Sequence, residues 1–466
     1  MNDQKNLILA VALSIGIFFT WDHFFGVKPQ TVQTQTQVVE SAPLSEKTVP
    51  IAAPVENMIV DRPLALTDER IAIETDKIKG SIRLKGALLD DVTLLNHRTS
   101  VDKDSDPIYI LSPKNTKDAY FVDFNVLCAD AAEQPTADTV WQVLDHRTLT
   151  PETPVTLFWV SPKGVRFERR FEIDADYLVT VFNKVTNHSD AALCVQHQGM
   201  IQRQKPKTEG FFILHEGAIG FIDNHLVERE YDKIAEKTKE DIKSSGGWVG
   251  FTDKYWLVAM IPNQKAEKTF SFKGNTENGF STAIASEQKS LQPGEGLEQS
   301  VHVFVGPKKL KLLDAYEGKL GVNKLDLAID FGWFYFLTKP LFQFLDLVHG
   351  FVGNFGIAIL ILTLLSKILL FPLANKSFYS MARMKALAPK MDQIKARFKD
   401  DPVKLQQEIM NLYKSERVNP LSGCLPMLVQ APIFFCLYKV LFISIEMRHA
   451  PFIGWIQDLS APDPTT

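Results

Sequence analysis

A chain of 466 residues exceeds what one hydrophobic core usually supports, so two or more structural units are expected. The 51 basic and 55 acidic residues leave a net charge of −4, which gives no global reason to expect a nucleic-acid partner. The 45% hydrophobic content is typical of a soluble protein, but the apolar residues are concentrated in three runs that are candidates for membrane spans.

The first apolar run, Asn6–Phe25, follows Lys5 and approaches the roughly 20 residues that a spanning helix needs. A cleaved signal peptide is the alternative, but the run ends in Trp21 and other bulky residues that offer no cleavage site. Residues 1–26 are therefore predicted to be an uncleaved transmembrane anchor. Residues 27–60 are rich in Gln, Thr, Pro and Ser and lack periodicity, which predicts a flexible periplasmic tether.

Residues 61–320 repeatedly alternate apolar and polar side chains, as in Val165–Ile173, and a period of two is typical of half-buried strands. Turn signals such as Asp223–Asn224 and Pro293–Gly296 separate the alternating runs. No regular βαβ alternation is found. The sequence therefore predicts a large antiparallel β sandwich, beside an α-helical membrane portion, in a multi-domain membrane protein.

Histidines in this β-rich segment have no spacing that places an acid/base pair or a metal triad, and ordinary core and surface histidines are the favoured interpretation. They are His188, His197, His215 and His225. Large β sandwiches also bind sugars, so a membrane-tethered sugar-binding or epimerising domain is kept as an alternative function.

The cysteines show no CxxC or Cys/His ligand spacing, so neither a metal nor a cofactor is predicted. Cys128 and Cys194 lie in the β-rich segment and are candidates for a disulfide if that segment is exported to an oxidising compartment. Their separation in sequence does not predict their distance in space, so a disulfide and two free thiols both stay open as alternatives.

The second apolar run lies within residues 351–373, and as a helix it would match the hydrocarbon thickness of about 30 Å. It contains Lys367, whose ammonium group would cost at least about 2.5 kcal/mol if it faced lipid. Two interpretations stay open: the side chain reaches the headgroups, or it lines a water-filled groove with Thr363 and Ser366 on the same helix. A transporter that uses Lys367 as a counter-ion is a further alternative.

Residues 374–423 carry ten basic and five acidic residues, so the positive-inside rule predicts a cytoplasmic segment. The N-terminus is then also cytoplasmic, and the β domain is periplasmic. Apolar residues spaced three and four apart predict that residues 374–423 form a helical hairpin of two amphipathic helices, with Asp401 capping the second and Pro402 opening it.

One face of the first predicted amphipathic helix carries a stripe of methionines, Met381, Met384 and Met391. Methionine side chains adapt in shape, so the stripe is a candidate contact for varied hydrophobic clients. Such a stripe more often joins two helices to each other. The basic face is expected to attract anionic lipid, without direct recognition of nucleic acid.

The third apolar run lies within residues 424–446 and is again long enough to span. Gln430 would either help line the groove of Lys367 or hydrogen-bond a neighbouring helix. Lys439 is expected to reach the periplasmic surface with its charged end. Residues 447–466 are then a periplasmic loop.

Five stretches carry a likeness to a known family: Leu325–Gly356, the span around Lys367, Tyr413–Tyr438, Met447–Pro464 and Ser245–Pro262. The first four resemble the membrane portion of the YidC/Oxa/Alb family of membrane protein insertases, and Ser245–Pro262 resembles the periplasmic domain of that family. The resemblance implies a hydrophilic groove whose single cation receives the acidic end of a client, and by position that cation is Lys367. Arginine is the more familiar residue there, and lysine keeps the charge without the planar fork for carboxylates.

The resemblance also implies an interfacial helix in residues 321–350, an epimerase-like supersandwich without established catalysis, and a non-enzymatic role in the bacterial inner membrane. The implied partners are nascent membrane proteins, the Sec translocon, and the ribosome and signal recognition particle machinery. Family members continue into three more spans after the loop that ends near Pro464. The chain stops at Thr466, so either it is a fragment or the missing helices come from elsewhere, and a fragment is the favoured expectation.

Overall fold

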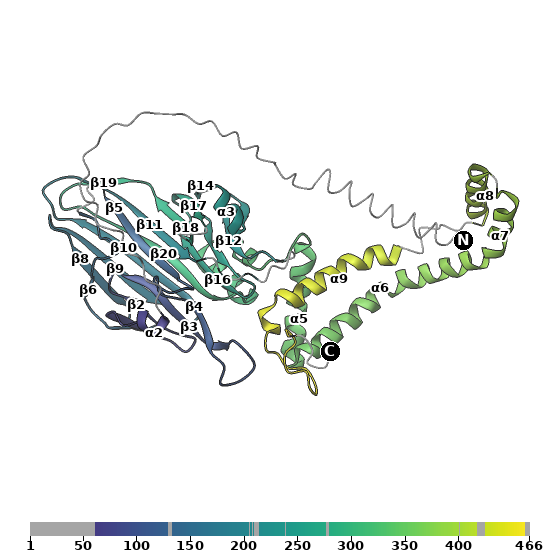
Figure 1. The fold of residues 1–466 in the computed structure, drawn as a ribbon, viewed down its shortest axis with the longest axis horizontal. Helices are drawn as coiled ribbons and strands as arrows, with labels where there is room; N and C mark the ends of the chain where they lie inside the picture. The colour runs from purple at the N-terminus through teal and green to yellow at the C-terminus, as the bar shows by residue number, and fades with distance from the viewer. Residues whose placement is uncertain are drawn as a thin grey trace, which may run out of the picture. The chain divides into compact units, whose positions relative to one another are not determined.

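The computed structural model describes residues 61–461, apart from 129–132, 205, 207, 209–213, 238, 276–278, 400 and 417–424. The predicted anchor at residues 1–26 and tether at residues 27–60 lie outside the described residues. The described chain consists of a two-sheet β domain followed by a group of helices (Figure 1).

The first sheet has eleven strands, nine of them in the order β14-β17-β18-β11-β5-β3-β2-β1-β7, while β19 pairs with β11 and β4 with β3. The strands are β1 (Arg70–Glu74), β2 (Ile78–Arg83), β3 (Leu88–Arg98), β4 (Pro107–Leu111), β5 (Tyr120–Cys128), β7 (Thr148–Leu149), β11 (Leu193–Arg203), β14 (Lys239–Ser245), β17 (Glu267–Asn275), β18 (Gly279–Ser286) and β19 (Lys289–Leu291).

The second sheet has nine strands in the order β13-β12-β15-β16-β20-β10-β9-β8-β6. The strands are β6 (Gln142–Val143), β8 (Val155–Val160), β9 (Val165–Ile173), β10 (Leu178–Asn187), β12 (Gly217–Ile222), β13 (His225–Arg229), β15 (Trp248–Thr252), β16 (Trp256–Pro262) and β20 (Gly296–Pro307). The predicted large antiparallel sandwich is confirmed, with one exception: the two-residue strand β7 runs parallel to β1.

The alternation that predicted strands corresponds to burial in β9, where every second side chain from Val165 to Ile173 is buried. The predicted turn at Asp223–Asn224 joins β12 to β13, and both residues have positive φ angles, 51° and 59°. Asn and Asp tolerate this left-handed conformation better than most residues, and it suits the tight turn of a hairpin.

Arg169 occupies one of the buried positions of β9 and connects the two sheets. Its guanidinium group donates to the Asn183 side chain at 2.8 Å, to the carbonyl of Ala87 at 3.0 Å, and to the carbonyl of Phe124 on β5. It also lies 4.8 Å from the centroid of the Trp141 ring. Burial lowers the pKa of Arg169 to about 10, so the group stays charged at neutral pH.

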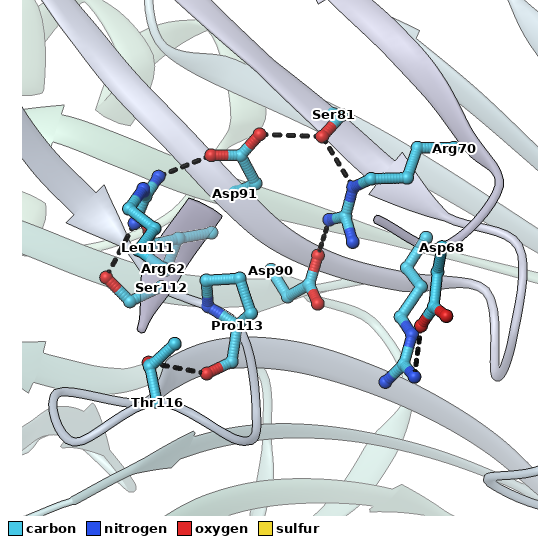
Figure 2. Close-up of polar contacts among 11 residues, drawn as sticks. Arg62, Asp68, Arg70, Ser81, Asp90, Asp91, Leu111, Ser112, Pro113 and Thr116 are labelled. Atoms are coloured by element: carbon cyan, nitrogen blue, oxygen red, sulfur yellow. Dashed lines mark hydrogen bonds and ion pairs between the residues drawn. The ribbon is translucent and has the colours of Figure 1, made fainter. Parts of the chain in front are cut away.

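A second set of buried charges fixes the start of the β domain to the first sheet (Figure 2). Arg62, on the short helix α2 (Arg62–Ala65), pairs with Asp91 and donates to the hydroxyl of Ser112 at 2.8 Å. Arg70 pairs with the fully buried Asp90. Burial raises the pKa of Asp90 to about 6, and the attraction of Arg70 opposes this shift.

The two cysteines of the β domain lie on neighbouring strands but do not form a disulfide. Cys128 on β5 pairs in register with Val195 on β11. Because successive side chains of a strand point to opposite faces, Cys194 projects from the other face of the sheet. The strand register therefore separates the two sulfur atoms, which sequence alone could not reveal.

Helices follow and flank the sandwich. The short helix α3 (Tyr231–Lys237) lies between β13 and β14, while α4 (Leu310–Leu320) and the 3₁₀ turn η2 (Leu325–Ala328) follow β20 and bury their apolar residues in the same core. The expected interfacial segment begins as a regular helix only at α5 (Tyr335–Val352). Lys339 of α5 donates to Asp314 at 3.0 Å and to the buried Asp326 at 2.5 Å, which attaches α5 to the β domain.

The membrane portion contains α6 (Phe355–Ala386), α7 (Ala388–Arg397), α8 (Pro402–Ser415), α9 (Leu425–Ile443) and the 3₁₀ turn η4 (Ile445–Met447). Within the described residues, α6 is the helix long and apolar enough to cross a membrane, and α9 contributes a shorter apolar stretch, Leu428–Ile443. The helices α5, α6 and α9 pack against one another.

The expected boundary between span and hairpin at residue 373 does not coincide with a helix end. α6 continues through Pro372 to Ala386, because a proline removes one backbone hydrogen bond without preventing the following turns. Met381 and Met384 therefore belong to α6, and the first predicted hairpin helix is divided at Leu387. The start of the second is confirmed: Asp401 accepts the backbone N–H of Lys404 at 3.1 Å, and Pro402 opens α8.

Candidate functional site

The polar residues predicted to line a groove meet between α6 and α9. Thr363, Ser366 and Lys367 of α6 and Gln430 of α9 line one small pocket of about 10 Å³. This volume is just enough for one water molecule. We call these four residues the groove residues. Residues at positions i, i+3 and i+4 of a helix share a face, which explains why Thr363 approaches Ser366 and Lys367.

A larger open cavity of about 540 Å³ adjoins the small pocket and extends along α6 toward the hairpin. Lys367 and Gln430 line both spaces, as do Leu370 and Phe434. Ser377 and Met381 line the far part of the larger cavity. A positive charge and an amide thus lie where a mainly apolar cavity narrows.

Lys367 forms no ion pair among the residues that the structure describes. Its ammonium nitrogen lies 5.1 Å from the centroid of the Phe434 ring, within the range of a cation–π interaction. Such a contact offsets part of the cost of removing an ammonium group from water but leaves its charge uncompensated. The site can therefore attract an anionic group that enters the cavity.

The methionine stripe divides between two environments. Met381 is 40% exposed and lines the larger cavity. The sulfur of Met391 on α7 instead accepts a hydrogen bond from the hydroxyl of Tyr413 on α8, at 3.1 Å. Met384 lies near the end of α6 and does not line either cavity. Met391 thus joins the two hairpin helices, as the alternative interpretation of the stripe suggested.

Two features of this region were missed or misjudged from the sequence. Phe434, the aromatic neighbour of Lys367, lies one helical turn after Gln430, and that spacing was a usable signal. The partner of Lys439 was also missed: its side chain is 4% exposed, and its ammonium pairs with Asp330 at 2.9 Å. Asp330 is distant in sequence, so no local pattern pointed to it.

Two apolar helices, α6 and α9, are joined to a β sandwich and carry, beside a cavity, a cation that has no ion pair among the described residues. This arrangement is typical of a membrane protein with a polar surface inside its helical portion.

A family model described as the YidC periplasmic domain matches residues 70–344, and one described as 60Kd inner membrane protein matches residues 347–466. The membrane protein insertase YidC of Rickettsia canadensis (strain McKiel) is 43% identical, with 100% of this chain and 84% of the relative aligned. That of Rickettsia prowazekii (strain Madrid E) is 42% identical over the same shares.

The chain therefore belongs to the YidC family of membrane protein insertases. Its relatives are named for insertion, a non-enzymatic role.

Solved structures give weaker similarities. A crystal structure of an active YidC insertase with its first transmembrane domain resolved is 19% identical, with a TM-score of 0.32, and the match covers 86% of this chain and 78% of that one. A galactose mutarotase related enzyme from Lactobacillus acidophilus is 12% identical, with a TM-score of 0.35, covering 51% and 97%.

Proposed function

We propose that this protein inserts membrane proteins into the bacterial inner membrane, and that Lys367 receives the acidic, polar end of a client segment. The observation that carries the proposal is the ammonium group of Lys367, which lies at the junction of two cavities without a carboxylate partner among the described residues. Thr363, Ser366 and Gln430 add hydrogen-bonding groups that help retain water beside it.

A single cation in the groove can offset most of the free-energy cost of bringing an acidic client residue into the membrane. An acidic residue at the centre of a spanning helix costs about 2.5 to 3.5 kcal/mol. Two opposite unit charges about 6 Å apart attract by roughly 3 kcal/mol at an effective dielectric constant of 20, so a groove cation offsets most of that cost. The apolar part of the client then partitions sideways into lipid, and its burial there provides the driving force. No chemical step is needed.

We further propose the orientation that the charges favour. The hairpin, from residue 374 to 423, lies in the cytoplasm, the β domain lies in the periplasm, and residues 1–26 anchor a multi-pass chain. Met381, which lines the larger cavity, contacts the apolar part of a client. Met384 and Met391 lie outside that cavity and extend the client contact along the hairpin. Nascent membrane proteins are the clients, and the Sec translocon, the ribosome, the signal recognition particle machinery and anionic lipid are the partners at these surfaces.

Reconstitution of the purified protein into vesicles tests this function. A single-span client with two aspartates in its translocated end should become protease-protected more efficiently in these vesicles than in empty ones. The same client with two asparagines should gain less from the protein, because the neutral end does not use the cation. Equal protection in empty and loaded vesicles would reject the insertase function, and an equal gain for both clients would reject the role of Lys367.

A further inference from the structure

A layer of polar side chains crosses the interior of the β sandwich between its two sheets. In the first sheet, Lys268 on β17 is the register partner of Ser286 on β18, and the backbone N–H of His197 on β11 donates to the Ser286 hydroxyl at 3.1 Å. In the second sheet, Asn183 on β10 is the register partner of Gln299 on β20. All five residues line one small pocket of about 20 Å³, which has room for about one or two water molecules.

Lys268 brings a positive charge to this pocket. Its side chain is buried, and its ammonium group donates to Oε1 of Gln299 at 3.0 Å without forming an ion pair among the described residues. Burial and the charge of Lys289 lower the pKa of Lys268, and the charge of Glu287 opposes them. The described residues that line the pocket include neither aspartate nor glutamate. The ammonium group therefore lacks the partner that a buried charge normally has.

The other side chains of the pocket present hydrogen-bond donors. Oδ1 of Asn183 accepts from Arg169 at 2.8 Å, so the opposite end of this amide is an NH₂ donor. Oε1 of Gln299 accepts from Lys268, which leaves an NH₂ donor there as well. The ring of His197 lies close to the backbone of Asn183, but neither ring nitrogen makes a hydrogen bond of normal geometry with a described residue. Burial lowers the pKa of His197 to about 4, and the neutral ring carries one N–H donor.

We propose that this pocket binds a single chloride ion, held by the ammonium group of Lys268 and the amide NH₂ groups of Asn183 and Gln299, with His197 as a further donor. Chloride is close to water in size, whereas phosphate and carboxylate anions need more room than the pocket provides. The ion neutralises the buried ammonium group, and the N–H donors replace its hydration shell. Because these donors belong to both sheets, the bound ion stabilises the sandwich. This inference depends neither on the membrane placement nor on the role of Lys367.

Thermal unfolding of the complete purified protein tests the site. Sodium gluconate, whose anion is too large for the pocket, is replaced stepwise by sodium chloride at constant ionic strength. A ligand that binds only the folded state raises the free energy of unfolding with the logarithm of its concentration. The unfolding midpoint of the β domain, followed by tryptophan fluorescence, should therefore rise by about 2 to 5 °C for each tenfold increase in chloride above the dissociation constant.

Lys268→Met removes the charge and keeps an apolar stem, so the dependence of the midpoint on chloride should disappear. Lys273→Met is the matched control, since Lys273 is an exposed lysine of the same strand that does not line the pocket, and it should retain the dependence. A midpoint that does not change when chloride replaces gluconate would overturn the proposal and leave water as the occupant. A chloride dependence that survives Lys268→Met would also overturn it.

Bromide locates the ion in the unmodified protein, and this measurement still decides if Lys268→Met does not fold. Crystals of the complete protein are grown with bromide in place of chloride. The anomalous scattering of bromide should give a peak inside the pocket, beside Lys268 and Asn183. Bromide peaks confined to the surface of the protein would contradict the proposed site.

Discussion

Lys367→Glu is expected to reduce the insertion of a client with an acidic translocated end by at least roughly tenfold, because the charge reversal removes an attraction and adds a repulsion of similar size. A tenfold change corresponds to about 1.4 kcal/mol, which is less than the roughly 3 kcal/mol that one charge pair contributes in a groove of intermediate dielectric constant. Protease protection of the client in cells depleted of their own insertase measures the effect, with the amount of variant protein checked in parallel.

Two variants separate the role of this charge from a general disturbance of α6. Lys367→Arg keeps the charge and should retain most of the insertion. Lys376 is an exposed residue of the same helix and lines neither cavity. Lys376→Glu should therefore have a much smaller effect on insertion. A client whose translocated end carries lysine should lose less than the acidic client. Normal insertion of the acidic client by a well-expressed Lys367→Glu protein would refute the proposed role.

Arg169→Met is expected to destabilise the β domain by about 3 to 5 kcal/mol, because three buried acceptors lose their donor at about 1 to 3 kcal/mol each. The substitution preserves an apolar stem but leaves the buried carbonyl groups of Ala87 and Phe124 and the side chain of Asn183 without their donor. These acceptors come from both sheets, so the loss should lower the midpoint of cooperative unfolding. Guanidinium unfolding of residues 61–330, followed by tryptophan fluorescence, measures the change.

Arg170→Met is the control for Arg169→Met, because Arg170 is the next residue of β9 and points to the opposite face. It is half exposed and pairs with Glu172 at 2.5 Å, and an exposed ion pair of this kind contributes about 0 to 1 kcal/mol. The two variants should therefore differ in stability by more than about 2 kcal/mol. Similar unfolding midpoints for both would contradict the bridging role of Arg169.

The β class of the large domain was predictable because alternating burial is a local property of each strand. The position of Arg169 was predictable in the same way, since it takes an inward place in the alternation of β9. Its partners were not predictable, because Ala87, Phe124 and Asn183 belong to other segments. The separation of Cys128 from Cys194 also depends on strand register, which only the complete sheet defines.

The candidate site was partly predictable for a similar reason. Thr363, Ser366 and Lys367 are within about one turn of each other on α6, so helical geometry alone places them together. That Gln430 joins them depends on how α9 packs against α6, and no local pattern specifies this. The extension of α6 beyond Pro372 was missed because a proline was interpreted as an end.

The access of water to Lys367 tests the central claim most directly. Both variants are made in a protein without the native cysteines. Leu370→Cys places a thiol on the lining of both cavities, one turn from Lys367. Leu369→Cys places a thiol on the outer side of α6, where the side chain is 79% exposed and lines neither cavity. A water-soluble, membrane-impermeant thiol reagent requires the hydrated thiolate, so position 370 should react at least roughly tenfold faster than position 369. If position 370 reacts as slowly as position 369 in the intact membrane protein, the lysine side of the helix faces acyl chains, and the proposed groove does not exist.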